Sequence, residues 1–532
     1  MCVFSSPFPD VDIPDVSIYD YLFRGLTGAE LDRTAVVDGA SGTATTYREL
    51  TAQVDALAGA VAARGLGVHG VAAVLCPNIP AFPVVFHGLL RAGATITTIN
   101  SLYTADEIAH QLTDAGADWL FTISALLPAA REAAERTGIP AERLVVLDGA
   151  DGHPSLQDFL AAGAPAPEVA IDAATHIAVM PYSSGTTGRP KGVLLSHRNL
   201  VANVEQSRGL LDIGAEDRLL ALLPFFHIYG MTVLLNLAFR QRARLVTMAK
   251  FELPEFLRIV QERRCSYLFI APPLAVALSK HPMVDEYDLS SVHTTLSGAA
   301  PLDGELGTLL AERLGCRVLQ GYGMTEMSPV SHLIPRNAPG VPVSSVGYTV
   351  PNMECRLVDP ATGEDLEIPA VGESAAGHLL CRGPNVMLGY LNRPEETADT
   401  LDSDGYLHTG DIATVRADGV VTIVDRLKEL IKYKGYQVAP AELEALLLTH
   451  PGIADAAVIG TNDADGQEVP KAFIVRQDGP VGEALDEGAV TEFVAARVAP
   501  FKKVHHVEFI DAVPKSASGK ILRRILKTTD RT

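Results

Sequence analysis

The sequence predicts an α/β protein with a large and a small domain. Residues 1–425 are expected to form helix-covered sheets plus a β-barrel-like subdomain, and residues 426–532 a small mobile α+β domain. Three observations carry this prediction. Strand and helix patterns alternate up to about residue 345, which favours parallel sheets covered by helices. Short strands and glycine-rich turns follow, and a smaller unit begins after Asp425.

The first third of the chain supplies clear helix and strand signals. Thr46 and Glu49 form a capping box at the start of a predicted helix. Apolar residues recur through it at helical spacing, and Gly65 is its predicted end. Residues 71–75 are apolar and stop before Pro77, which is typical of a short buried strand.

The same alternation continues along the chain. We expect a helix near residues 81–91 and another that begins at the capping box Thr104–Glu107. The expected strands lie at residues 94–99, 119–123, 218–223, 244–248 and 267–270. Residues 151–170 are rich in Gly, Pro and Ala and predict a surface connection.

The small domain is predicted from a second change of pattern. A helix is expected at residues 441–448, with strands around 456–459 and 471–475. The domain boundary is placed near Asp425, where the short strands of the preceding region end.

Composition excludes several classes of protein. The 532 residues carry 43 Lys and Arg against 64 Asp and Glu, a net charge of −21, so DNA and anionic membranes would repel the chain. The six cysteines contain no C-x-x-C pair, which favours reduced thiols in the cytoplasm. No apolar run is long enough for a membrane span, and the first residues lack the pattern of a secretory signal.

The strongest chemical signal is a segment of small hydroxyl residues and glycines at residues 182–192. Such residues let backbone N–H groups approach phosphate oxygens, and Lys191 adds charge. The segment is not a Walker A loop, because Gly192 follows the lysine. The candidate phosphate-binding residues are Ser183, Ser184, Gly185, Thr186, Thr187 and Lys191. The alternative is a flexible glycine-serine turn.

Two further segments suit a nucleotide. At residues 320–326, Tyr322 can stack on a flat ring and Glu326 can help hold Mg²⁺ through oxygen. Asp411 follows a glycine and can accept two hydrogen bonds from a ribose diol. The alternatives are a strand-to-turn connection for the first segment and a turn or cap role for Asp411.

Two basic segments lie in the last 110 residues. Arg426, Lys428, Lys432 and Lys434 crowd together at the proposed domain junction, in a chain that is otherwise acidic. Lys520 ends a Ser-Gly-rich loop from which it can reach a phosphate or a carboxylate. A solvated face and a frayed tail are the alternatives.

Taken in order, these five segments closely resemble those of the acyl-adenylate-forming enzymes, which include acyl-CoA synthetases, firefly luciferase and peptide-synthetase adenylation domains. Residues 224–230, 297–302 and 425–442 look most like 4-coumarate:CoA ligases. The resemblance implies ATP, Mg²⁺ and coenzyme A as cofactors. It also implies an aromatic propenoic acid, 4-coumarate or cinnamate, as substrate, first activated as acyl-AMP and then transferred to the thiol of coenzyme A.

The resemblance also implies roles in the first step. Ser183 through Thr187, with Lys191, would cradle the ATP phosphates, Thr325 would contact the α-phosphate, and Lys520 would bridge that phosphate and the carboxylate. Glu326 would bind Mg²⁺. The adenine, acyl and ribose contacts would come from Gln320, Gly321, Tyr322, Asp411 and Arg426.

In the second step the C-terminal domain would rotate about Asp425. Lys520 would leave the site, and a different set of residues would face coenzyme A or acyl-AMP: Lys250, Lys428, Lys432, Lys434, Gly435 and Gln437. His227 would sit between the acyl site and the pantetheine tunnel; the alternative is a ring packed beside Phe225 and Phe226.

The implied acyl pocket is Tyr229, Val233, Ala299, Gly323, Pro329 and Val330. Ala299 and Gly323 would leave room for a flat ring against Tyr229. One departure from the plant enzymes is Leu296, where they carry a lysine before the Ser-Gly pair. A more apolar pocket would let cinnamate be used as well as 4-coumarate.

Other functions remain open at this stage. They are a medium- or long-chain fatty acyl-CoA synthetase, a luciferase-like oxygenase, a stand-alone adenylation module that loads a carrier protein, and a catalytically dead scaffold. A lysine acyltransferase that acts on Lys520 is a further partner implied by related synthetases, since acylation removes the charge needed in the first step.

Overall fold

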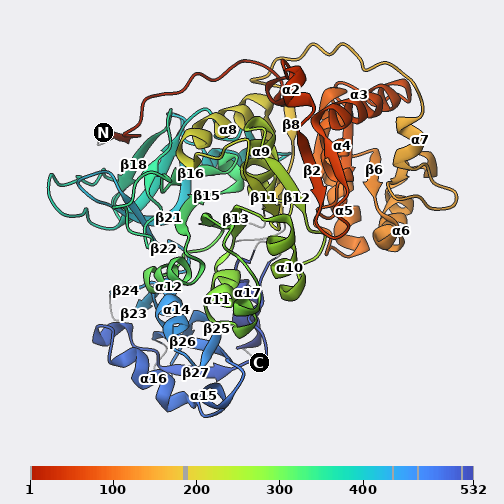
Figure 1. Cartoon of the computed structure of the whole chain (residues 1–532). Coiled ribbons are helices and arrows are strands. Elements are labelled where there is room, and N and C mark those ends of the chain that lie inside the picture. Colours follow the sequence, from red (N-terminus) through yellow and green to blue (C-terminus); the bar gives the residue numbers. More distant parts are fainter. Residues whose placement is uncertain (1–2, 184–189, 434–435, 464–466, 517–518, 531–532) are drawn as a thin grey trace.

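The computed structural model describes residues 3–183, 190–433, 436–463, 467–516 and 519–530. Two helix-covered sheets and an antiparallel sheet form the large part of the molecule, and the segments coloured blue in Figure 1 form a smaller unit beneath them. The predicted fold class, a large α/β N-terminal part followed by a smaller C-terminal unit, is confirmed.

The first sheet is formed by the N-terminal third together with two strands from later in the chain. Its central strands are parallel and β10 pairs antiparallel with three neighbours. The order of its described strands is β20 (Gly389–Tyr390), β10 (Lys191–Ser196), β8 (Ile177–Val179), β5 (Thr95–Thr98), β4 (Val71–Val74), β6 (Trp119–Thr122) and β7 (Leu144–Val146), with β9 (Tyr182–Ser183) beside β10.

Helices of the N-terminal third accompany this sheet. They are α3 (Tyr47–Ala63), α4 (Ala81–Arg91), α5 (Ala105–Ala115), α6 (Leu127–Thr137) and α7 (Leu156–Leu160). Both predicted capping boxes are confirmed: Thr46 and Thr104 each accept a hydrogen bond from the backbone N–H of a glutamate three residues on. The short helix α7, itself started by a Ser155 capping box, lies in the stretch that we expected to be a surface connection.

The second sheet is larger, and its central strands are again parallel. Its described strands run in the order β17 (Tyr348–Thr349), β16 (Val330–Leu333), β15 (Arg317–Gly323), β14 (Thr294–Ser297), β13 (Tyr267–Ile270), β11 (Arg218–Ala221), β12 (Arg244–Thr247), β2 (Thr34–Asp38) and β3 (Ala44–Thr46). Its accompanying helices are α1 (Ile18–Phe23), α2 (Gly28–Leu31), α8 (His197–Leu211), the π-helix η3 (Tyr229–Asn236), α9 (Leu237–Arg240), α10 (Leu253–Arg263), α11 (Pro272–Lys280) and α12 (Gly304–Leu314).

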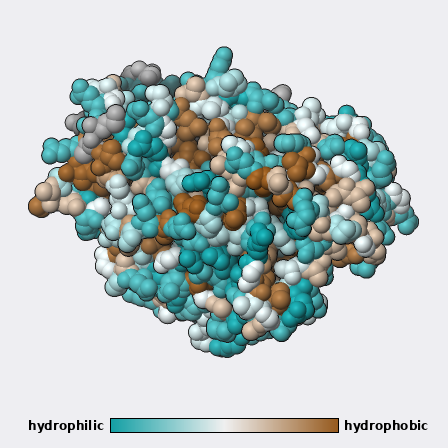
Figure 2. Space-filling model, turned by 90° about the horizontal axis from the view of Figure 1, so that it is seen from above, coloured by the Kyte–Doolittle hydropathy of each residue, from teal (hydrophilic) through white to brown (hydrophobic). Residues whose placement is uncertain are grey.

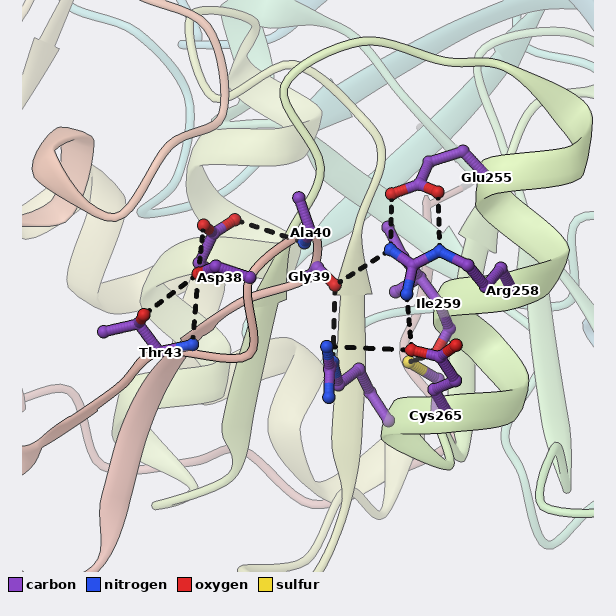
Figure 3. A network of polar contacts seen from close by, with 11 residues as sticks. Asp38, Gly39, Ala40, Thr43, Glu255, Arg258, Ile259 and Cys265 are labelled. Carbon is purple, nitrogen blue, oxygen red and sulfur yellow. Dashed lines mark hydrogen bonds and ion pairs between the residues drawn. The ribbon is translucent and has the colours of Figure 1, made fainter.

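A polar network fixes the edge of this sheet to a helix. Figure 3 shows Gly39, which follows the last residue of β2, Asp38, beside Arg258 of α10. The Arg258 Nη2 atom lies 3.5 Å from the Gly39 carbonyl oxygen, and its guanidinium also donates two hydrogen bonds to Glu255, of 2.6 and 2.7 Å. The network holds the β2–β3 hairpin in place at a distance from the site described below.

The short strands predicted after residue 345 form an antiparallel sheet. Its described order is β1 (Val3–Ser5), β18 (Glu354–Val358), β19 (Gly377–Arg382), β21 (Leu407–Val415) and β22 (Val421–Arg426). The short helix α13 (Pro394–Thr400) lies between β20 and β21 in the chain.

The chain after β22 forms its own apolar core. The hairpin β23 (Ile431–Tyr433) and β24 (Tyr436–Val438) leads to a three-stranded sheet and four helices. These are β25 (Ile453–Asn462), β26 (Glu468–Arg476), β27 (His506–Phe509), α14 (Pro440–Thr449), α15 (Pro480–Glu483), α16 (Glu487–Ala495) and α17 (Arg523–Thr529).

The outer surface is mixed in polarity. On the face seen in Figure 2, hydrophobic residues lie in separate groups among hydrophilic ones. Among the helices that the structure describes, none is both long enough and apolar enough to cross a membrane.

Candidate active site

A cavity of about 810 Å³ brings all five sequence segments together. It lies where the chain leaves β5 and β15, which is the carboxyl end of parallel strands and a common place for ligands in open α/β sheets. The smaller C-terminal unit closes part of it. The sequence-predicted residues on its wall are Ser183, Lys191, His227, Ala299, Gly323, Thr325, Glu326, Asp411, Arg426, Lys428 and Lys520.

One side of the cavity carries a cation, a ring and a carboxylate in contact. The Nζ atom of Lys191, at the start of β10, lies 4.8 Å from the centre of the Tyr390 ring. The Tyr390 hydroxyl donates a 2.8 Å hydrogen bond to Glu326 Oε1. Burial and the neighbouring Glu326 raise the pKa of Tyr390, so the hydroxyl keeps its proton. Glu326 itself is only 4% exposed.

Another part of the wall carries Asp411 and Arg426, with Tyr322 of the adjoining small cavity in contact with Asp411. The Tyr322 hydroxyl donates to Asp411 Oδ2 at 2.5 Å, and Arg426 Nε lies 3.5 Å from Asp411 Oδ1. Asp411 and Arg426 are directly paired across strands β21 and β22. Burial raises the pKa of Asp411, against the opposing effects of Arg426 and Tyr322. A buried carboxylate supplied with two partners can accept polar hydrogens from a ligand.

Lys520 reaches this cavity from the C-terminal unit. Its loop is closed by a 2.8 Å hydrogen bond from Ser516 N to the Lys520 carbonyl oxygen. Gly519 has φ +86°, and an added Cβ would lie 3.0 Å from Ala271 Cβ, so glycine lets the loop approach the large domain. Burial, followed by the charge of Arg426, lowers the pKa of Lys520 to about 8, although Glu429, Asp411 and Glu326 oppose the shift.

A smaller apolar cavity of about 60 Å³ adjoins the first. The two share His227, Ile228, Ala299, Gly323 and Met324 as lining residues. The remaining wall of the small cavity is Tyr229, Leu296, Gly298, Gly321, Tyr322, Pro329, Val330 and Leu333. All the predicted acyl-pocket residues except Val233 are therefore brought together here, and Leu296 lies among them.

Close backbone approach shapes this small cavity. A Cβ added to Gly323 would lie 2.1 Å from the Pro329 carbonyl oxygen, which no side chain allows. The Tyr229 hydroxyl donates a 3.4 Å hydrogen bond to the Leu296 carbonyl oxygen, which fixes the ring beside the cavity. Only a residue without a side chain fits at Gly323, which explains the small residue expected there.

His227 lies on the wall common to both cavities. Burial, followed by the charge of Lys520, lowers its pKa to about 4, so the ring is neutral at pH 7. Two hydrogen bonds fix the loop that precedes His227. Phe225 N donates to Oδ1 of the buried Asn78 at 2.8 Å, and Thr98 Oγ1 donates to the Phe226 carbonyl oxygen at 2.6 Å. His227 is thus positioned by residues far away in sequence.

Four of the predicted site residues whose side chains the structure describes line neither cavity. The side chain of Gln320 is buried and bonded to backbone groups of Leu302 and Val343, so it ties a loop to β15. Val233 is buried in the π-helix η3 and does not line either cavity. Lys250 is exposed and paired with Glu252 at 2.8 Å, and Lys432 is exposed on β23.

Some predicted residues lie outside the described structure. These are Ser184, Gly185, Thr186, Thr187, Lys434 and Gly435. Gln437 belongs to β24, but its side chain is also outside the description.

Several residues of the large cavity were not predicted from the sequence. One of them is Tyr390, which contacts both Lys191 and Glu326. Phe226, Met324, His378 and His408 also line the wall. The only sequence signal at Tyr390 is its place after Gly389, because its strand reaches the site through pairing with β10, about 200 residues away.

Comparison with known proteins agrees with this geometry. A family model described as "AMP-binding enzyme" matches residues 25–391, and one described as "AMP-binding enzyme C-terminal domain" matches residues 442–520. The chain belongs to the AMP-binding enzyme family, and the resemblance inferred from the five segments is confirmed.

Relatives at about 40% identity are 4-coumarate–CoA ligases. The chain is 41% identical to 4-coumarate–CoA ligase 5 of Oryza sativa subsp. japonica, over 99% of this chain and 97% of the relative. It is 39% identical to 4-coumarate–CoA ligase of Pinus taeda, with the same coverage of both chains.

Solved structures, among them two that are named CoA ligases, share the fold. An anthranilate CoA ligase in complex with anthranoyl-AMP gives a TM-score of 0.88 at 25% identity, covering 98% of each chain. ATP-bound MatB from Rhodopseudomonas palustris gives 0.85 at 30% identity, covering 97% of this chain and 99% of the other. A benzoate CoA ligase from Burkholderia xenovorans gives 0.84 at 26% identity, covering 96% and 99%.

Proposed function

We propose that the protein is an AMP-forming acid:CoA ligase that acts on an aromatic propenoic acid. The observation that carries this proposal is the pair of adjoining cavities. The larger is lined by charged groups suited to a nucleotide, the smaller is apolar, and Lys520 lies on the wall of the larger one. The names of the 4-coumarate–CoA ligase relatives point in the same direction.

The larger cavity would bind ATP. Asp411, held by Tyr322 and Arg426, would accept hydrogen bonds from the ribose diol. Lys191 and Thr325 would contact phosphate oxygens, together with the predicted hydroxyl residues between 184 and 187. The acid's carboxylate oxygen attacks the α-phosphorus, the bond from that phosphorus to the β-phosphate oxygen breaks, and pyrophosphate leaves. Lys520 would stabilise the negative charge on the reacting groups by position and charge.

Glu326 fits Mg²⁺ that enters with the triphosphate. Among the described residues, no three His, Cys, Asp or Glu side chains are placed to hold a metal ion by themselves. Mg²⁺ commonly takes one or two carboxylates and obtains its other oxygens from substrate phosphates and water. Bound there, it would neutralise phosphate charge; Glu326 would be its protein ligand.

The apolar cavity would hold the acyl group. Tyr229 and Leu296 form part of its wall, and a space of about 60 Å³ suits a compact flat group better than a long acyl chain. Because Leu296 stands on the wall where the plant enzymes carry a lysine, this position has no charged group to interact with the ring hydroxyl of 4-coumarate. We therefore propose that cinnamate is used as well as 4-coumarate.

The thioester step would use a second orientation of residues 426–532. We infer that the chain divides at Asp425, whose Oδ2 accepts from Ala441 N at 2.9 Å and so joins β22 to α14. After rotation, Lys434, Gly435 and Lys250 would contact coenzyme A. Lys428, the exposed Lys432 and Gln437 would contact acyl-AMP or support its site. The thiol sulfur then bonds to the acyl carbon, the acyl–phosphate oxygen bond breaks, and AMP leaves.

A product analysis tests the proposal. The purified protein is incubated with ATP, Mg²⁺, coenzyme A and a panel of 4-coumarate, cinnamate, caffeate, benzoate, octanoate and palmitate, and products are identified by mass spectrometry. We expect thioesters of the phenylpropenoates. Thioesters of the fatty acids alone would contradict the substrate class, and acyl-AMP without thioester would indicate a carrier-protein acceptor.

We also propose that Lys520 is a target of a lysine acyltransferase, and that the protein works in the cytoplasm. The five described cysteines are free and buried, as expected in a reducing compartment. Acylation of Lys520 would remove the charge that adenylation needs. Mass spectrometry of protein purified from its source tests this, and an unmodified Lys520 under all growth conditions would contradict it.

A further inference from the structure

Tyr390 connects two charged groups of the nucleotide cavity that do not contact each other. Its hydroxyl donates to Glu326 Oε1 at 2.8 Å, and its ring faces Lys191 Nζ at 4.8 Å. No ion pair between Lys191 and Glu326 is found in the part of the chain that the structure describes. Tyr390 is 9% exposed and Glu326 4%, so this tyrosine and carboxylate are largely shielded from solvent, whereas Lys191 is half-buried.

The backbone fixes Tyr390 relative to both partners. Strand β20 pairs with β10, which begins at Lys191, and Leu391 N donates to the Gly192 carbonyl oxygen at 2.8 Å. On the other side, Met387 N donates to the Glu326 carbonyl oxygen, also at 2.8 Å. These backbone hydrogen bonds therefore hold Tyr390 in position between Lys191 and Glu326.

A lysine and a glutamate in one cavity attract each other strongly when water is scarce. A direct ion pair would satisfy both groups and leave less charge for a phosphate and a cation. With Oε1 occupied by Tyr390, Glu326 has Oε2 without a bonded donor among the described residues. The ring meanwhile stabilises Lys191 by cation–π attraction without neutralising it.

We propose that Tyr390 is a positioning residue that keeps Lys191 and Glu326 apart and presents Glu326 Oε2 to the Mg²⁺ of bound Mg·ATP. This inference rests on the proposed function, in which Glu326 is the protein ligand of Mg²⁺. It assigns a separate role to each half of the side chain: the hydroxyl orients Glu326, and the ring separates the charges.

The two halves are separable by substitution. In Tyr390→Phe the ring remains but Glu326 loses its donor, so ATP affinity should respond less to Mg²⁺ while affinity for metal-free ATP stays unchanged. In Tyr390→Leu the aromatic ring between Lys191 and Glu326 is also lost, so these two residues should form an ion pair. Lys191 would then offer less charge to a phosphate, and metal-free ATP should bind more weakly too. A hydrogen bond to a charged group corresponds to about a tenfold change in affinity.

A matched control lies elsewhere in the protein. Tyr21 of α1 donates a 2.5 Å hydrogen bond to Glu205, and the guanidinium of Arg240 lies 4.5 Å from its ring centre. This trio also has a cation, a ring and a carboxylate, although here Arg240 pairs directly with Glu205 at 3.3 Å, and its members line neither cavity. It therefore controls for loss of the tyrosine–glutamate hydrogen bond and not for separation of the charges. Tyr21→Phe should alter thermal stability much as Tyr390→Phe does, without changing the effect of Mg²⁺.

Titration calorimetry with ATP, in Mg²⁺ and in EDTA, provides the test. We expect Mg²⁺ to strengthen ATP binding about tenfold less in Tyr390→Phe than in the wild type or Tyr21→Phe. A folded Tyr390→Phe protein with the full wild-type response to Mg²⁺ would overturn this inference alone. A wild-type protein that binds no ATP under either condition would overturn the proposed function and this inference with it.

Discussion

The charge of Lys520 should control how adenylation depends on pH. Its pKa is lowered to about 8 by burial and by Arg426. The group is charged below that pH and neutral above it. The protonated fraction thus falls from about 90% at pH 7 to about 10% at pH 9, whereas an ordinary lysine would keep about 95% of its charge at pH 9. Adenylation should decline as pH rises through about 8.

The assay is ATP–pyrophosphate exchange with a non-phenolic acid such as cinnamate, so that no substrate phenol titrates in the same range. Because kcat/KM reports the groups of the free enzyme, it should fall about tenfold per pH unit above 8. Lys520→Arg is the matched control, since arginine stays charged: its kcat/KM should be lower throughout but level between pH 8 and 10.

Two results would refute this reasoning. A wild-type profile that stays level to pH 10 would mean that the free lysine is not perturbed. A Lys520→Arg profile with the same decline near pH 8 would assign the titration to another group. Lys520→Ala should lose most of the exchange activity, and wild-type rates of acyl-AMP formation in that variant would contradict the role of the lysine.

Three further substitutions test other parts of the structure. Gly323→Ala should abolish acyl binding, measured by titration with the acid, because its Cβ would lie 2.1 Å from the Pro329 carbonyl oxygen. Leu296→Lys should raise the ratio of 4-coumarate to cinnamate turnover, measured as kcat/KM for each acid; an unchanged ratio would place the specificity elsewhere. Arg523 donates a 2.6 Å hydrogen bond to the buried Glu444. Because Arg523→Ala leaves that carboxylate without its cationic partner, it should lower the free energy of unfolding by about 3–5 kcal/mol. Denaturant unfolding measures this, and a change below about 1 kcal/mol would contradict it.

Local signals were enough to predict many of the elements. The capping boxes at Thr46 and Thr104 and the helix at residues 81–91 are found where expected, because capping and apolar spacing act within one helix. The small helix α7 was missed in a stretch whose composition suggests a loop, although its Ser155 cap was a usable signal.

Site residues could be predicted where neighbouring residues in the sequence indicate their role. They could not be predicted where the role depends on contacts between distant parts of the chain. Glu326 and Asp411 were identified from their neighbours in sequence, and the structure places both on the cavity wall. Tyr390 was missed because its contacts depend on strand pairing across about 200 residues. Gln320 looked like a ligand contact, yet its amide is used by backbone groups that sequence spacing does not reveal. Val233 was expected in the acyl pocket from the resemblance, yet it is buried in a π-helix and lines neither cavity.

The apolar cavity has a consequence for how such enzymes diversify. Every described residue that lines it lies between His227 and Leu333, one continuous stretch of the chain. Lys520, Asp411 and Arg426 lie outside that stretch. A single recombination event that exchanges this stretch between relatives would therefore carry a complete acyl site with it, and would leave the described residues Asp411, Arg426 and Lys520 in their original context.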